Sequence, residues 1–335
     1  MYPWAPRAGI VLLALVAIAV AISGTGIGVG PAWQWTWRDA LTNPFFACAT
    51  LAGGLLVLPR LRKPAERGAA AVLALLFAGG AVVASRPDAA TDYLFRGALG
   101  LGLASIVVHG VVAARLPEGQ RQLARRESLI AFLFALAGGL IPFFGILTAG
   151  FRPLTLDAFA LAIDGALGIQ PSATFGAWVK SVSALEAIFV LVYAGAFLAI
   201  ALVHHAQARV VRDRGRLLLD VLVIAALGVA LHHVFPTAGP AKAFASFPEL
   251  PVAFPVTTTL VEPAPRSSMP ALPMAFAVAL YWHARKLGPR MHAFGIAWLA
   301  LTFAACLGLG AHYFLGLVLA VPSAALMMAL LARGG

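Results

Sequence analysis

The stretch PRSSMPALPMAF, residues 265–276, passes from a polar, proline-rich segment into an apolar run. The stretch GAHYFLGL, residues 310–317, makes the same transition and opens another apolar run. Each stretch therefore predicts the start of a hydrophobic helix, and the order of the runs predicts both starts at one membrane face. The first start carries Arg266, which can bind an anion, and the second carries His312, which can act as a nucleophile.

The composition of the whole chain predicts an integral membrane protein. Of its 335 residues, 61% are hydrophobic and 11% are charged, and the mean hydropathy is +0.91. A soluble domain of this size carries about 25% charged residues. The net charge of +11 lies in short clusters between apolar runs, where it sets orientation, and this pattern argues against nucleic-acid binding. Cys48 and Cys306 stand inside apolar runs without metal-ligand spacing, so we expect core residues, no metal and no cofactor.

Apolar windows predict an all-α protein with about ten transmembrane helices. The windows cover residues 8–29, 42–59, 68–85, 94–114, 128–149, 182–203, 217–235, 269–284, 292–309 and 312–332. Most basic residues fall in alternate loops, at 60–67, 115–126, 209–216 and 285–290. The positive-inside rule then predicts cytoplasmic N- and C-termini, as in a multi-pass protein of a bacterial inner (plasma) membrane. His283 and His292 would be surface residues on the cytoplasmic side.

Three separate elements are predicted to bring polar side chains to the outer face. The seventh window ends in LHHVFPTAGPAK, residues 231–242, which supplies Lys242; Arg266 and His312 follow on the next two elements. Lysine and arginine bind phosphate oxygens, and a helix N-terminus adds N–H groups for an anion. A neutral histidine beside them can attack phosphorus. Taken singly, such cations usually bind lipid phosphate or solvent, so the convergence carries the prediction.

Three motifs in this region resemble a known family. They are GPAKAF at 239–244, RSSMPALPMA at 266–275 and GAHY at 310–313. Together they resemble the type 2 phosphatidic acid phosphatase superfamily, and most closely its inositolphosphoceramide-synthase-like (inositolphosphotransferase) bacterial branch. The resemblance implies a six-helix phosphatase-like membrane core at 128–335, after an N-terminal four-helix transmembrane module at 1–127. It also implies a phospholipid or polyprenyl-phosphate substrate.

The resemblance assigns roles to individual residues, and it also shows departures. It makes His312 the nucleophile and Lys242 and Arg266 the phosphate binders, with Gly239 and Pro270 inside the binding motifs. The family's acid histidine is replaced by Pro273, its orienting aspartate by Gly316, and an arginine that many members carry by Cys306. His233 is the candidate for the vacant acid role. Since general acid–base catalysis is worth about 10²–10⁴-fold, these losses predict slow catalysis unless other groups substitute.

Three functions remain open at this stage. The first is a lipid-phosphate phosphatase or head-group phosphotransferase that acts at the outer leaflet through a phosphohistidine. The second is a catalytically impaired relative that binds a phospholipid or lipid-linked phosphate without turnover. The third is a transporter, for which the sequence offers only Glu186 and Asp220 as charges within or near the spans.

Overall fold

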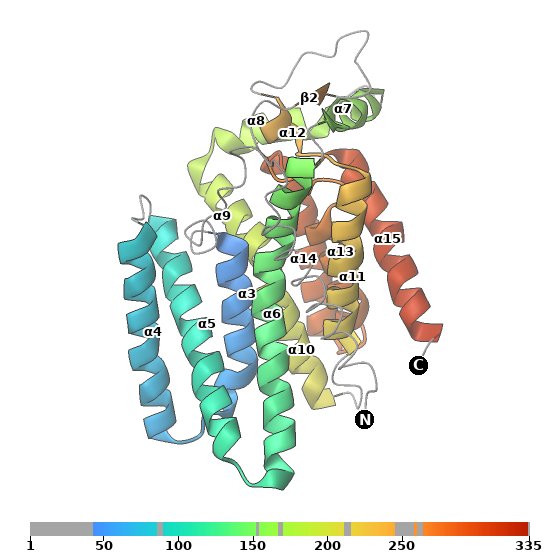
Figure 1. Cartoon of the computed structure of the whole chain (residues 1–335). Helices are drawn as coiled ribbons and strands as arrows, with labels where there is room; N and C mark the ends of the chain where they lie inside the picture. Colours follow the sequence, from blue (N-terminus) through green and yellow to red (C-terminus); the bar gives the residue numbers. More distant parts are fainter. Residues whose placement is uncertain are drawn as a thin grey trace.

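The computed structural model describes residues 43–85, 90–151, 154–166, 170–210, 216–244, 258–259 and 264–333, and it is helical (Figure 1). The first half contains α3 (Pro44–Val57), the 3₁₀ helix η2 (Leu58–Arg60), α4 (Pro64–Ser85), α5 (Ala90–Arg115) and α6 (Glu118–Phe151). The second half contains α7 (Asp157–Ala166), α8 (Pro171–Lys180), α9 (Ser183–Ala194), α10 (Ala196–Val210), α11 (Arg216–Val234), α12 (Pro240–Ala243), α13 (Leu272–Ala284), α14 (Pro289–Gly308) and α15 (Phe314–Arg333). Two short strands, β1 (Leu154–Thr155) and β2 (Thr258–Thr259), pair antiparallel.

Six of the described helices are long and apolar enough to cross a membrane: α4, α5, α6, α11, α14 and α15. A seventh span results if α8 and α9, which meet at an angle of 119°, count as one. The apolar stretches Pro44–Arg60, Ala196–Ala208 and Leu272–Ala284 are shorter. The chain is therefore a multi-pass membrane protein with six or seven candidate spans, and the predicted number of about ten is not shown. The predicted first span, 8–29, lies outside the described residues.

The prediction differs most from the structure between the fifth and sixth predicted spans and within the sixth. The window 182–203 is divided at Gly195 into α9 and α10, whose backbone does not continue as one helix. Part of the predicted outer loop 150–181 forms α7 and α8, which lie at the upper end of the molecule in Figure 1. Glycine and proline near these breaks, such as Gly195 and Pro171, explain why one long apolar pattern becomes short segments.

The two halves of the chain pack against each other through α3, α6, α10 and α13. The Phe134 ring on α6 meets Phe197 on α10 at 5.5 Å, and Phe197 meets Phe276 on α13 at 5.7 Å. Small residues allow α3 to approach α6, since a Cβ on Gly138 would collide with Ala49. Because lipid tails are as apolar as these side chains, close packing rather than water exclusion stabilises such contacts.

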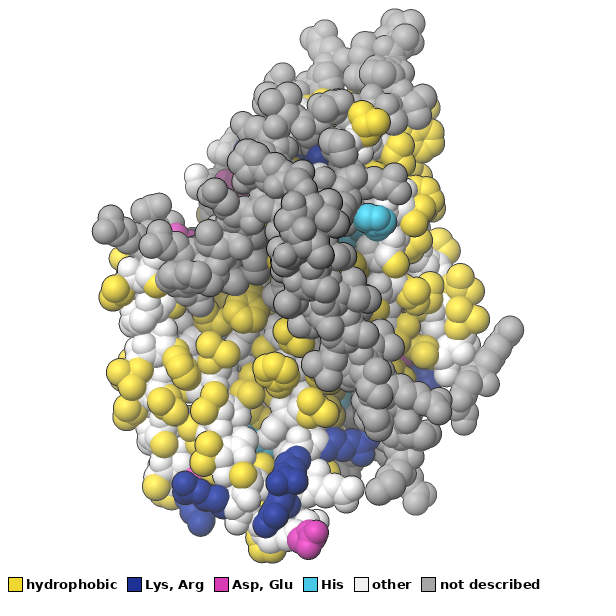
Figure 2. Space-filling view, in the orientation of Figure 1, with side chains coloured by type: hydrophobic (Ala, Val, Ile, Leu, Met, Phe, Trp, Pro, Cys, Tyr) yellow, Lys and Arg dark blue, Asp and Glu magenta, His cyan; other side chains and the backbone are white. Residues whose placement is uncertain are grey.

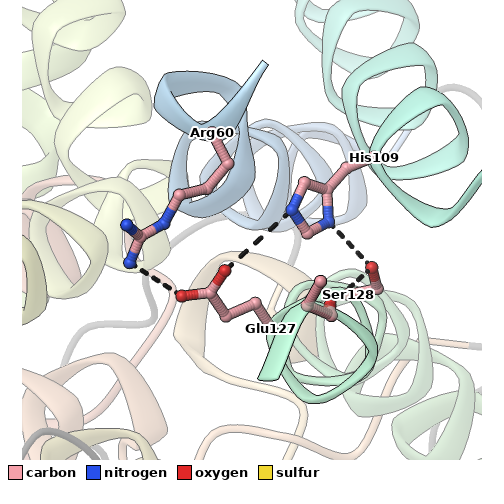
Figure 3. A network of polar contacts seen from close by, with 5 residues as sticks. Arg60, His109, Glu127 and Ser128 are labelled. Carbon is pink, nitrogen blue, oxygen red and sulfur yellow. Dashed lines mark hydrogen bonds and ion pairs between the residues drawn. The ribbon is translucent and has the colours of Figure 1, made fainter. Parts of the chain in front are cut away.

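Charged side chains mark the end of the molecule opposite α7 and α8. Figure 2 shows lysine and arginine side chains at the lower end, below a belt of hydrophobic side chains. Figure 3 shows a polar network near this end, in which Arg60 lies 2.7 Å from Glu127 and His109 donates to Ser128 at 2.8 Å. The Ser128 hydroxyl donates onward to the Ala124 carbonyl at 3.1 Å, so His109 Nδ1 carries the proton. This network joins η2, α5 and α6.

A second buried network corrects the prediction for His283. This side chain is only 8% exposed, and its Nε2 donates to the Asp220 carboxylate at 2.8 Å. Gln207 Nε2 lies 3.3 Å from His283 Nδ1, and Arg216 donates to the same carboxylate at 3.1 Å. The sequence suggested a surface residue because the partners come from α10 and α11, far from His283 in the chain. Asp220 is held by Arg216 and His283, and this buried network links α11 to α13.

Candidate active site

His312 stands in the short connection between α14 and α15 and is 1% exposed. Its backbone N–H and that of Ala311 both donate to the Cys306 carbonyl, at 3.3 and 3.2 Å. Its own carbonyl accepts a hydrogen bond from the Ser172 hydroxyl at 2.9 Å. Hydrogen bonds to α14 and α8 therefore hold the backbone of His312 in place, independently of the contacts of its side chain.

Both ring nitrogens of His312 have a partner. Nδ1 lies 2.8 Å from the backbone carbonyl oxygen of Ser268, and Nε2 lies 2.9 Å from the Tyr193 hydroxyl. A carbonyl oxygen only accepts hydrogen bonds, so the neutral ring must carry its proton on Nδ1. Nε2 then holds the free electron pair and accepts a hydrogen bond from Tyr193. The arrangement fixes one tautomer, in which Nε2 is the ring nitrogen that carries an electron pair.

The surroundings of His312 keep its ring neutral. The pKa of His312 is lowered to about 4, chiefly by burial; nearby His232 and the charge of Lys242 contribute to the lowering, while the hydrogen bond to the Ser268 carbonyl opposes it. A histidine in water has a pKa of about 6.5. At neutral pH the ring is therefore uncharged, which is the form that can attack phosphorus.

Two cations stand near this histidine. Arg266 is 2% exposed, donates to the Ala264 carbonyl at 2.7 Å, and its backbone N–H donates to Gly145 of α6 at 2.8 Å. Burial lowers the pKa of the Arg266 guanidinium, and the charge of Asp157 opposes the lowering. Lys242 on α12 is exposed, yet it is close enough for its charge to act on His312. Lys242 thus acts on His312 through its charge, and Arg266 lies two residues before Ser268, whose carbonyl binds the His312 ring; that the three form one site stays a prediction.

Four polar side-chain atoms in this region have no hydrogen-bond partner in the part of the chain that the structure describes. They are Gln170 Nε2, His232 Nδ1, Thr237 Oγ1 and Ser268 Oγ. The side chains of His232, Thr237 and Ser268 are at most 2% exposed. Burying polar groups without partners costs about 1–3 kcal/mol each, so such a set usually waits for a ligand or ordered water. Backbone contacts link the set to His312, because Ser268 N–H donates to Thr237 at 3.0 Å.

Helix α7 carries two carboxylates that hold the loops of this site. Asp157 accepts hydrogen bonds from Ala238 N–H and Gly239 N–H, at about 3.0 Å each, and from the Tyr313 hydroxyl at 2.8 Å. Asp164 accepts from the first backbone N–H groups of α15, those of Phe314 at 2.8 Å and Leu315 at 3.0 Å. Burial raises the pKa of Asp164, and these two N–H groups oppose the rise. α7 thus ties together the segments before α12 and α15.

The other predicted binding residues have backbone roles. Gly239 has φ +95°, and a Cβ there would collide with the Ala311 carbonyl oxygen, so only glycine suits the position. Its N–H is already bound to Asp157. Pro270 is buried, and its carbonyl accepts a hydrogen bond from His232 Nε2 at 2.9 Å. Both residues shape the site without offering a free donor.

The two adjacent histidines at the end of α11 differ in their surroundings. His232 is 2% exposed and bound to Pro270, whereas His233, the predicted acid, is exposed. With Nε2 donating to a carbonyl, the neutral His232 has an unpaired acceptor at Nδ1. The acid role predicted for His233 stays a prediction, and neutral His232 can only accept a hydrogen bond at Nδ1.

The positions that depart from the resemblance have physical explanations. A Cβ on Gly316 would lie 2.8 Å from the Ser268 carbonyl oxygen, the atom that orients His312, and the Gly316 carbonyl accepts from Ala271 N–H. A backbone carbonyl thus occupies the place where a carboxylate would act. Pro273 sits in the first turn of α13, where its missing N–H costs nothing.

Fold and site together define a multi-pass membrane protein with a buried histidine and arginine beside unpartnered polar groups. Residues 159–330 match the family model described as the PAP2 superfamily. The chain therefore belongs to the PAP2 superfamily, a family of membrane phosphatase-like proteins that implies lipid-phosphate substrates in general. Comparisons with curated proteins and with solved structures gave no match. The superfamily predicted from the sequence is confirmed, whereas its inositolphosphoceramide-synthase-like branch is not shown.

Sequence reasoning missed Tyr193, Ser268 and the two carboxylates of α7. Tyr193 lies in an apolar run and gave no signal. The Ser268 contact is made by a backbone atom, which has no side-chain signature. Asp157 and Asp164 were visible as acidic residues seven positions apart on a predicted surface segment, but their targets lie more than 80 residues away.

Proposed function

We propose that this chain is a lipid-phosphate phosphatase or head-group phosphotransferase that works at the outer leaflet through a phosphohistidine on His312. The observation that carries the proposal is the fixed tautomer of a buried neutral His312, with Nδ1–H on the Ser268 carbonyl and a free electron pair on Nε2. The site lies at the end of the molecule opposite the basic side chains, which supports the outer leaflet (Figures 1 and 2). The inositolphosphoceramide-synthase-like branch remains part of the proposal.

The phosphate group would be held by charge and by the unpartnered donors. Arg266 offers a planar fork and Lys242 a point charge. The hydroxyls of Thr237 and Ser268 and the amide of Gln170 can donate further hydrogen bonds. Exposed Lys242 would meet the head group first, and buried Arg266 would hold the phosphate beside His312.

The reaction would proceed in two displacements. The Nε2 electron pair forms the N–P bond while the ester P–O bond breaks, and the leaving oxygen takes a proton from protonated His233, the exposed histidine on α11. Water, or an acceptor hydroxyl in a transferase, then attacks phosphorus and returns a proton to that histidine. The P–N bond breaks and its electron pair goes back to Nε2. The Ser268 carbonyl keeps the tautomer throughout, but it stabilises the charged ring less than a carboxylate does, which predicts slow turnover.

A second candidate function follows from the same residues. Pro273 and Gly316 stand where the acid and the carboxylate are expected, so the site would keep its phosphate binders and lose its chemistry. Such a protein would bind a phospholipid or lipid-linked phosphate without turnover. Binding would be saturable and would weaken in Arg266→Ala.

The test uses the purified full chain in vesicles that contain phosphatidic acid or a polyprenyl phosphate. We expect phosphate release, or transfer to an added hydroxyl acceptor, that His312→Ala abolishes and His205→Ala, an exposed histidine on α10, retains. Arg266→Ala should raise KM. Saturable binding without release above the His312→Ala background would favour the second function. If the protein shows no binding and no release, both functions are overturned.

The same assay separates the two histidines on α11. We expect His233→Gln to lower kcat by about 10²–10⁴-fold, the usual loss of a general acid. His232→Gln should lose less, because the proton of neutral His232 is bound to the Pro270 carbonyl. The reverse order would move the acid role to His232.

A further inference from the structure

The nucleophilic nitrogen of His312 is covered by a single hydroxyl. Tyr193 Oη lies 2.9 Å from Nε2, and the two rings are 5.7 Å apart at an angle of 46°. Because Nδ1 carries the ring proton, the Tyr193 O–H must donate to the Nε2 electron pair. This bond therefore involves the same electrons that would attack phosphorus.

Two aromatic rings pack against Tyr193, those of Phe45 and His312. The Phe45 and Tyr193 rings make a T-shaped contact, with centroids 4.9 Å apart and planes at 79°. Phe45 lies at the start of α3, where its backbone N–H donates to the Asn43 side chain at 2.9 Å. These contacts restrain the Tyr193 ring, so its hydroxyl remains close to Nε2 after their hydrogen bond breaks. The N-terminal half of the chain thus helps to place a group of the site.

We propose that Tyr193 is a catalytic residue of the second displacement, which rests on the proposed phosphohistidine. While Nε2 is bonded to phosphorus it has no electron pair, and the Tyr193 hydroxyl has lost its acceptor. As water or an acceptor hydroxyl attacks phosphorus, the P–N bond breaks and its pair returns to Nε2. The Tyr193 O–H donates to that returning pair and stabilises it as it forms, so histidine becomes a better leaving group. No proton is transferred from Tyr193, and its hydrogen bond is restored for the next cycle.

The first displacement places a different demand on Tyr193. Its hydrogen bond to Nε2 must break before attack, so the hydroxyl stabilises the resting state and gives no help to N–P bond formation. In-line attack also puts the leaving oxygen on the opposite side of phosphorus, away from Tyr193. Removing the hydroxyl should therefore slow dephosphorylation and leave phosphorylation as fast or faster.

The test measures both half-reactions with a ³²P-labelled lipid phosphate in rapid-quench experiments on the full chain in vesicles. In Tyr193→Phe we expect label to accumulate on His312, as an acid-labile and alkali-stable adduct, up to one per chain. Dephosphorylation should slow by up to about 10-fold, the usual worth of one hydrogen bond between neutral groups. The matched control is Tyr281→Phe on α13, whose ring packs on His292 away from the site.

The outcomes distinguish this inference from the proposed function. Labelled His312 with unchanged dephosphorylation in Tyr193→Phe would overturn the role of Tyr193 alone. Slower labelling with normal dephosphorylation would also overturn it, since Tyr193 would then serve the first displacement. Absence of label and turnover in the unmodified protein would overturn the phosphohistidine itself, and the role of Tyr193 with it. If Tyr193→Phe lowers the melting temperature, the alternative variant is Phe45→Leu. It keeps the Tyr193 hydroxyl but removes the ring that packs on Tyr193, so it should give a smaller accumulation of label.

Discussion

Two buried histidines, His283 and His312, lie at opposite ends of this protein, and they differ in the charge of the group that accepts their hydrogen bond. His283, at the end of α13, donates to the Asp220 carboxylate, which Arg216 also holds. His312, before α15, donates to the neutral carbonyl of Ser268. The histidine–carboxylate pair that the resemblance placed at His312 is thus found at His283, where charges compensate each other inside a structural network. A carboxylate beside a histidine therefore does not by itself mark a reacting residue, and the proposal for His312 rests instead on its fixed tautomer and on the nearby charge of Lys242.

The largest expected effect comes from placing a carboxylate beside His312. Gly316→Asp should not restore activity, because its Cβ would press on the Ser268 carbonyl that orients His312. We expect turnover to fall at least ~10-fold and the free energy of unfolding to drop by about 1–3 kcal/mol, as for other overpacked sites. The control is Gly119→Asp, where a Cβ meets nothing within 4 Å. A gain of turnover in Gly316→Asp would show that the carbonyl is only a poor replacement.

A smaller effect is expected from removing the inner histidine. His283→Ala leaves the Asp220 carboxylate and the Gln207 amide each without one partner. The free energy of unfolding should fall by about 1–3 kcal/mol, while turnover per folded protein stays unchanged. Thermal melting and turnover of the same preparation measure both. A loss of turnover without a change in melting would give the inner pair a functional role.

The smallest effect concerns pH. Because burial lowers the pKa of His312 to about 4, its ring stays neutral through mildly acidic conditions. With an activated phosphate ester whose leaving group needs no proton, labelling of His312 should stay constant from neutral pH and fall to half near pH 4. Half-loss near the ordinary histidine pKa of about 6.5 would mean that the ring is solvated. The free energy of unfolding should decrease as pH falls from about 6.5 toward 4, because only the unfolded chain then binds this proton.

The sequence predicted the helices well where one apolar run made one helix. The window 217–235 became α11 at Arg216–Val234. It failed where partners are distant or where backbone atoms act. Tyr193 in an apolar run, the Ser268 carbonyl and the Asp220–His283 pair all depend on contacts between elements. No local pattern encodes such contacts, so these residues could be found only after the helices were packed.

The two carboxylates of α7 have a consequence for how the site comes into being. Asp157 binds the segment before α12 and the Tyr313 side chain, and Asp164 binds the first N–H groups of α15. The helices that cross the membrane can insert one by one, but these bonds form only once α7 lies against both segments. We therefore expect the candidate site to assemble late in folding, when α7 docks. A protein inserted correctly but with α7 undocked should have all its spans and an unassembled candidate site.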